Sequence, residues 1–106
     1  MAQILSVALM NQPGAMARVA TELAAAGLNI EAFVGDTQAE VGVVRLLVDD
    51  PEKGLAILQK AGHPVQTIPG VKVDMANKPG ELAQCLRELG KAGINVELIF
   101  GSTGGA

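Results

Sequence analysis

The sequence has few of the residues that nucleic-acid-binding proteins use. It contains no Trp or Tyr, and its only aromatic residues, Phe33 and Phe100, lie in apolar segments. Eight Lys and Arg residues stand against eleven Asp and Glu, which gives a formal net charge of -3 and a pI near 5.0. Binding to phosphates needs clustered basic residues, and base stacking needs aromatic rings. We therefore expect no nucleic-acid partner.

Cysteine and long apolar runs are also scarce. Cys85 is the only cysteine, so the chain cannot close an internal disulfide, and the amino terminus lacks the basic region and apolar core of a signal peptide. No uninterrupted apolar stretch approaches the ~20 residues of a membrane-spanning helix. These absences predict a cytoplasmic protein with no membrane partner.

The sequence also lacks a catalytic or metal-binding constellation. The single histidine, His63, lies in a Gly-His-Pro turn without metal-ligand or triad spacing, so we expect a solvated loop residue. Cys85 falls on an apolar helix face and is expected to pack in a core. The acidic residues Asp49, Asp50 and Glu52 fit a helix start. We expect no enzyme activity, no catalytic residue, no metal and no cofactor.

What the sequence does contain is apolar residues, at 49% of its 106 positions, and an internal repeat. That composition is typical of a folded globular domain. A shift of 66 residues aligns positions 11–37 with 77–103. Twelve of these 27 pairs are identical, and they begin at Asn11, Pro13, Gly14, Ala17, Glu22, Leu23, Ala26, Gly27, Asn29, Glu31, Gly35 and Thr37. We interpret this as a duplication.

Residues 1–70 read as one complete α+β unit. Apolar runs with strand character alternate with helical periodicity, and Asp50-Pro51 and Gly62 mark the start and end of the second helix. The expected elements are a strand at 4–10, a helix from Met16, strands at 29–35 and 41–48, a helix after Asp50 and a strand at 65–68. This order, βαββαβ, predicts a ferredoxin-like sandwich.

Residues 71–106 read as a partial βαβ repeat. We expect strands at 71–75 and 95–100 around a helix whose apolar face comprises Leu82, Cys85, Leu86 and Leu89. Counterparts of 41–68 are missing, including the return strand that lies between the other two in a ferredoxin-like sheet. Unpaired strands invite another chain, so we expect strand-exchanged or sheet-extended homodimers or higher homo-oligomers.

The loops of the two copies carry a family resemblance. The segment Asn11-Gln12-Pro13-Gly14-Ala15-Met16 followed by Ala26-Gly27-Leu28-Asn29-Ile30, and its echo from Asn77 to Leu82 and from Ala92 to Val96, resemble the signature of ACT domains. Residues 44–53 are similar to the third strand and second helix start of stand-alone tandem ACT proteins. The departure from the family pattern is the missing end of the second unit.

The resemblance implies a non-catalytic regulatory protein that binds a small molecule between ACT-like units, with an amino acid as the expected effector. In the family, effectors sit where a strand-to-helix loop faces the second strand of a neighbouring unit. The ligand-binding residues that it implies are Asn11, Gln12, Pro13, Gly14, Ala15, Met16, Asn29, Ile30, Asn77, Pro79, Gly80, Glu81, Leu82, Asn95 and Val96. The alternative is a structural oligomerisation or docking module with no ligand.

Chemistry favours some of these positions directly. Gly14 lets a backbone approach a ligand closely, and a helix amino terminus presents N–H groups to a carboxylate. Asn29 and Ile30 could offer carbonyls to an ammonium group. Asn11 and Asn77 could instead cap the helix or satisfy loop backbone groups. Phe33 has the strand parity of Glu31, so we expect it on the sheet face away from the helices, packing at an interface.

Overall fold

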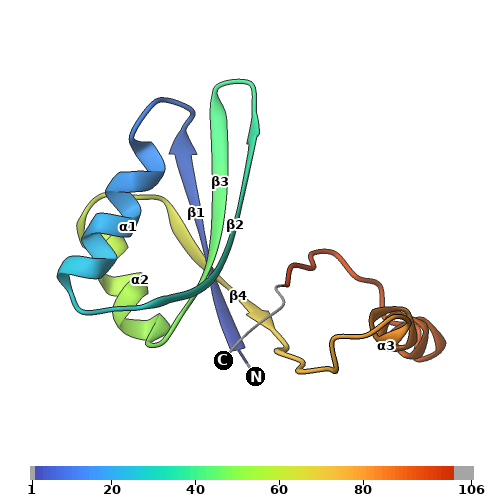
Figure 1. Cartoon of the computed structure of the whole chain (residues 1–106). Coiled ribbons are helices and arrows are strands. Elements are labelled where there is room, and N and C mark those ends of the chain that lie inside the picture. The colour runs from blue at the N-terminus through green and yellow to red at the C-terminus, as the bar shows by residue number, and fades with distance from the viewer. Residues whose placement is uncertain (1, 102–106) are drawn as a thin grey trace. The chain divides into compact units, whose positions relative to one another are not determined.

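The chain forms two compact units, the first ending at Val71 and the second beginning at Lys72. A computed structural model describes residues 2–101 of the chain (Figure 1). None of the helices in this described range is long and apolar enough to cross a membrane.

The first unit is a four-stranded antiparallel sheet with two helices on one face (Figure 1). Its elements are β1 (Ala2–Met10), α1 (Ala15–Ala25), β2 (Ile30–Gln38), β3 (Val41–Val48), α2 (Pro51–Lys60) and β4 (Val65–Gly70). The strand order is β2-β3-β1-β4, so the return strand β3 lies between β1 and β2. The predicted α+β ferredoxin-like architecture is confirmed.

The hydrophobic core lies between this sheet and its helices. Alternate residues of the two central strands point toward the helices, as strand geometry requires. The fully buried side chains include Leu5, Val7, Val19, Leu23 and Leu58. Leu9, Leu28, Val44, Leu46 and Val48 complete the core, which contains no buried polar residue among those described. Most of these residues belong to the runs from which the elements were predicted.

The ends of the helices follow local chemistry. Asp50 Oδ1 accepts a hydrogen bond of 3.2 Å from the backbone N–H of Lys53, and Pro51 occupies the first turn of α2. After α1, Gly27 adopts a φ of 79°, which glycine tolerates without a Cβ clash. Both features are those expected from the sequence.

Glycine also sets how closely α2 approaches the sheet. Gly54 is buried, and a Cβ built there would lie 2.9 Å from Leu5 Cδ1 and 3.3 Å from Val48 Cγ2. The helix axis therefore comes closer to β1 and β3 than a side chain at this position would allow. Ala61, by contrast, is the C-cap of α2 and is exposed.

A β-bulge corrects the predicted orientation of Phe33. The register between β2 and β3 shifts between Ile30 and Ala32, so that Phe33 pairs directly with Leu46. Directly paired residues of antiparallel strands share a face, and Leu46 points into the core. Phe33 therefore lies on the helix side of the sheet and not on the opposite face. It is 71% exposed because β2 is an edge strand.

His63 is not a solvated loop residue. Its Nε2 atom lies 3.1 Å from the Glu22 carboxylate oxygens, and its side chain is only 13% exposed. The contact joins the end of α1 to the loop before β4. Sequence spacing could not predict it, because the two residues lie 41 positions apart.

The second unit contains one helix, α3 (Glu81–Lys91), and none of the described residues 72–101 forms a strand. The strands predicted at 71–75 and 95–100 are therefore wrong for this structure. A β-strand requires hydrogen bonds to a neighbouring strand. In the first unit β3 pairs with both β1 and β2, and no residue of 72–101 provides an equivalent central strand. Cys85 is consequently half-buried on α3 and not in a core.

The Pro-Gly loops that precede α1 and α3 nevertheless have the same backbone structure. Gly14 and Gly80 precede their helices with φ of 84° and 90°. Matching backbone bonds follow: Arg18 N–H to Gly14 O and Gln84 N–H to Gly80 O, both 3.0 Å. The duplicated Pro-Gly loop is thus one local structure formed twice.

Candidate functional site

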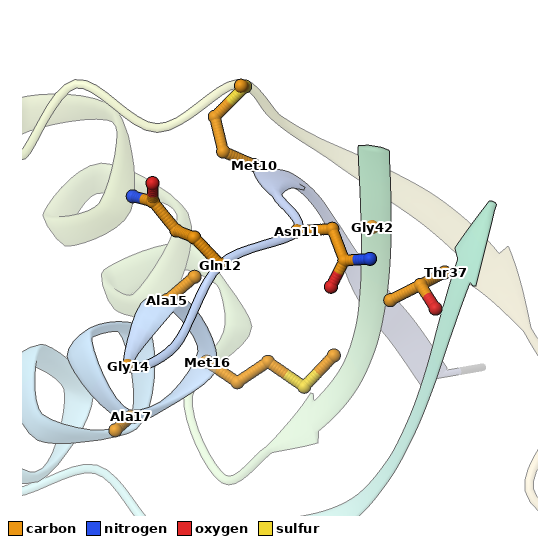
Figure 2. A pocket seen from close by; sticks show the side chains of 9 residues that line it. All are labelled: Met10, Asn11, Gln12, Gly14, Ala15, Met16, Ala17, Thr37 and Gly42. Atoms are coloured by element: carbon orange, nitrogen blue, oxygen red, sulfur yellow. The ribbon is translucent and has the colours of Figure 1, made fainter. Parts of the chain in front are cut away.

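A pocket of about 280 Å³ opens beside the first Pro-Gly loop (Figure 2). It lies between the end of β1, the start of α1 and the β2–β3 hairpin. The residues that line it are Met10, Asn11, Gln12, Gly14, Ala15, Met16, Ala17, Thr37 and Gly42. Five of them, Asn11, Gln12, Gly14, Ala15 and Met16, are predicted ligand-binding residues.

The amino terminus of α1 presents unpaired backbone donors to this pocket. Gly14 is the N-cap and supplies no side chain, and the first turn contains no acidic residue. The N–H groups of Met16 and Ala17 have no acceptor among residues 2–101. Such groups, with the positive end of the helix dipole, favour an anionic oxygen. The chemistry available here is the binding of a carboxylate.

Asn11 connects the loop to the hairpin. Its Nδ2 atom donates a hydrogen bond of 2.9 Å to the carbonyl oxygen of Ala39, and its backbone N–H donates to Glu40 at 2.8 Å. The alternative that Asn11 caps the following helix is wrong, because no side chain caps α1. Its amide satisfies a backbone group of a different loop, 28 positions away.

The lining side chains point in different directions. Figure 2 shows the Asn11, Met16 and Thr37 side chains extending into the space between α1 and the hairpin, whereas those of Met10 and Gln12 turn away from it. Pro13 is exposed and does not line the pocket. Its fixed φ shapes the turn that precedes Gly14.

Four lining residues were missed by the sequence reasoning: Met10, Ala17, Thr37 and Gly42. Ala17 and Thr37 are two of the identical pairs of the repeat, which was the available signal. Gly42 is buried, and a Cβ there would lie 3.2 Å from Thr37 Cγ2. Only the fold brings the hairpin to the loop.

The predicted residues Asn29 and Ile30 do not line this pocket. Asn29 donates its backbone N–H to Asp49 Oδ1 at 3.1 Å, and its carbonyl accepts the Asp49 N–H at 3.2 Å. Ile30 pairs with Val48. Their role as acceptors for an ammonium group remains a prediction.

The second loop differs electrostatically from the first. Glu81 occupies the first turn of α3 where α1 has Ala15, and its carboxylate lies 3.5 Å from Lys78 Nζ. An acidic side chain at a helix amino terminus already occupies the favourable field. Asn77, Pro79, Gly80, Leu82, Asn95 and Val96 are all exposed, as is the whole 71–80 segment. Their ligand contacts remain predictions.

No metal centre is present in the part of the chain that the structure describes. Residues 2–101 contain no group of three or more His, Cys, Asp or Glu side chains that could hold a metal ion. The polar groups that line the pocket are backbone N–H groups, the amides of Asn11 and Gln12 and the hydroxyl of Thr37.

Comparison with known proteins places these features in a family. No curated protein matches the chain. Protein BT0572 from Bacteroides thetaiotaomicron is 29% identical, with a TM-score of 0.92, over 97% of this chain and 72% of that one. The ligand-free regulatory subunit of aspartate kinase from Thermus thermophilus shares the fold at 24% identity, with a TM-score of 0.72, over 95% and 76%.

The subunit from Thermus flavus is similar at 22% identity, with a TM-score of 0.64, over 95% of this chain and 76% of that one. The family model described as an ACT domain pair matches residues 1–105. This range includes the whole first unit, the helix α3 of the second unit and both Pro-Gly loops. The chain belongs to the ACT domain pair family.

Proposed function

We propose that this chain is a regulatory protein that binds a free amino acid in the pocket beside Gly14. ACT domains are regulatory, non-catalytic modules, and membership of this family supports the regulatory role. One observation supports an amino acid as the ligand. The backbone N–H groups of Met16 and Ala17, which have no acceptor among the described residues, lie at a pocket of about 280 Å³.

The pocket offers complementary groups for both ends of a zwitterion. The α1 N–H groups suit the carboxylate. The Asn11 and Thr37 side chains project into the same space and carry oxygens that can accept from an ammonium group (Figure 2). Carbonyls at Asn29 and Ile30, or at Asn95 and Val96, from a neighbouring unit complete the recognition that the family resemblance implies.

The test is thermal melting of the chain in the presence of each of a panel of amino acids. Circular dichroism monitors the unfolding, because the chain has no Trp or Tyr for fluorescence. A ligand at a hundredfold excess over its dissociation constant adds about 2.7 kcal/mol of stability. We expect at least one amino acid to raise the midpoint for the wild-type chain. Gly14→Ala should abolish the shift, because Gly14 lines the pocket and its φ of 84° is strained for a residue with a Cβ, so the substitution displaces the loop and the first N–H groups of α1.

Gly80→Ala is the matched control. Gly14 and Gly80 have nearly equal positive φ and no neighbour within 4 Å of a built Cβ, so both substitutions carry the same backbone strain. Only the first lies in the pocket. Equal loss of the ligand response in both variants, or no response of the wild-type chain to any amino acid at millimolar concentration, contradicts the proposed site.

A second candidate function, assembly through the open sheet face, is favoured by Arg45. This residue pairs with Ser6 and Val34 on the sheet face opposite the helices, amid apolar neighbours such as Val43 and Leu47. Its Nε atom is buried without a hydrogen-bond partner among the described residues. A buried donor left unpaired is costly, so an acceptor from another molecule would complete it.

A second copy of the chain fits this face. Asp36 pairs with Val43 and so shares the open face with Arg45, yet no ion pair joins them within residues 2–101. In a two-fold interface each Arg45 can meet the other copy's Asp36, and both pairs form together. The face is then self-complementary in charge.

Charge exchange tests this interface. Arg45→Asp and Asp36→Arg should each weaken self-association by about tenfold or more, because each leaves like charges facing one another. The double variant should restore it. Light scattering coupled to size exclusion, run across a dilution series, measures the association. A monomeric wild-type chain, or a double variant no better than the single ones, argues against the open face.

A further inference from the structure

The sheet of the first unit is built from two βαβ halves whose strands pair only with each other. One half is β1-α1-β2 and the other is β3-α2-β4. The first strands, β1 and β3, are antiparallel neighbours at the centre, β2 pairs with β3, and β4 pairs with β1. Within this sheet, no strand pairs with the other strand of its own half. A single βαβ half therefore cannot form such a sheet alone.

Residues 71–101 carry the sequence of one such half, the counterpart of β1-α1-β2. The shift of 66 residues maps the buried residues of β1 onto apolar residues: Leu5, Val7 and Leu9 onto Val71, Val73 and Met75. These three side chains are exposed, and Val73 is 54% exposed whereas Val7 is 0% exposed. None of the described residues 72–101 forms a strand. This half has the apolar residues of a core but no second half to cover them.

The helix of this half lacks its cover as well. Cys85 and Leu89 are the counterparts of Val19 and Leu23, which are fully buried on α1. Neither counterpart is buried on α3. The segment after α3 adds four exposed apolar side chains, those of Ile94, Val96, Leu98 and Ile99. Strand segments and helix therefore both lack the partner that buries their counterparts in the first unit.

Two charged residues indicate what that partner is. The central strand pair is antiparallel, so two copies of 71–75 can pair about a two-fold axis. Both helices cover one face, as in the first unit, so the axis is perpendicular to the sheet and one residue faces its own copy. When that residue is Val73, Lys72 of each copy lies opposite Asp74 of the other. An axis through Lys72 or Asp74 would instead set like charges opposite each other. Neither residue has an ion-pair partner within residues 2–101.

We propose that two copies of the chain associate through residues 71–101 and complete one four-stranded unit between them, with Val73 on the two-fold axis. Each first strand then takes the central position that β3 has in the first unit. Val71 and Met75 of opposite copies pair on the side that the helices cover. In a dilute monomer the apolar face of α3 stays half-exposed, and association covers it. The interface is separate from the pocket beside Gly14.

Disulfide crosslinking tests the position of the axis. In a Cys85→Ser background, Val73→Cys should crosslink under mild oxidation, because paired residues of antiparallel strands lie within the Cα separation that a disulfide spans. Met75→Cys is the matched control, since Met75 is also exposed and apolar but would lie four residues along the strand from its own copy. We expect Val73→Cys to crosslink at least ~10-fold faster. Equal rates would show random collision only and overturn the proposal.

Charge reversal tests the strand pairing without cysteines. Lys72→Asp and Asp74→Lys should each weaken self-association at least ~10-fold, because each turns both opposite-charge pairs into like-charge pairs. An equal mixture of the two variants should restore it, since every pair in the mixed dimer is again of opposite charge. Light scattering coupled to size exclusion, over a dilution series, measures the association.

Three results would overturn the half-unit dimer. They are a monomeric wild-type chain, a mixture no stronger than the separate variants, and an association that neither substitution weakens. The last would assign self-association to another surface, such as the sheet face around Arg45. None of the three bears on the amino-acid site, because the pocket beside Gly14 is lined by residues of the first unit only.

Discussion

Replacing Leu23 with alanine is expected to lower the free energy of unfolding of the first unit by about 3–5 kcal/mol. Leu23 is 0% exposed on α1, and its removal leaves a cavity that the surrounding core residues can close only in part. Urea denaturation followed by far-ultraviolet circular dichroism measures the loss. Hydrogen exchange in β1 and β3 assigns it to the first unit.

The repeat supplies a control of identical chemistry. Leu89 is the counterpart of Leu23, but α3 contains no buried residue. Leu89→Ala should therefore cost less than about 1 kcal/mol, because little apolar area is lost from a half-buried site. Equal costs for the two substitutions would mean that Leu89 on α3 is covered in solution as Leu23 on α1 is.

The second large effect is expected at Gly54. Gly54→Leu should destabilise the first unit by about 3 kcal/mol, at the upper end for overpacking, because its side chain would meet the Leu5 and Val48 side chains. Leu5 is itself fully buried, so it cannot move aside into solvent. The same denaturation experiment measures the change.

Gly90→Leu is the opposite case. Gly90 is also inside a helix, but a Cβ built there meets nothing within 4 Å. Leucine has the higher helix propensity, so this substitution should stabilise α3 by about 0.5–1 kcal/mol. A tolerated Gly54→Leu, with a midpoint equal to that of the wild-type chain, would show that α2 can retreat from the sheet.

The fold of the first unit could be predicted because local signals and hydrophobic periodicity agreed. Asp50-Pro51 marked one helix start, Gly27 and Gly62 marked helix ends, and alternating residues such as those of 41–48 marked the central strand. These signals act within a few residues of each other. Such interactions can be recognised in a sequence without knowledge of the remote partner.

The features that escaped prediction depend on remote contacts. The bulge near Ile30 places Phe33 on the sheet face opposite to the predicted one, and no residue type in the sequence indicates such a bulge. The His63 contact with Glu22 required the loop and the helix to be brought together. The strands expected at 71–75 and 95–100 failed for the same reason, since their apolar sequence cannot supply a hydrogen-bonding neighbour.

The candidate site divides in the same way. The loop from Asn11 to Met16 was recognisable as a motif, and it lines the pocket apart from Pro13. The other wall comes from Thr37 and Gly42, which reach the loop only through the β2–β3 hairpin. The wall assigned by family resemblance to Asn95 and Val96 belongs to the second unit.

The bond from Asn11 to Ala39 has a consequence for how this site can evolve. Ala39 holds a φ of 58°, a conformation that costs a residue with a Cβ about 1 kcal/mol or more. The side-chain amide of Asn11 donates to the carbonyl oxygen of Ala39 and so holds that turn. Loop and hairpin therefore cannot drift independently in sequence: a change at position 11 calls for a matching change at position 39, with glycine there as the simplest.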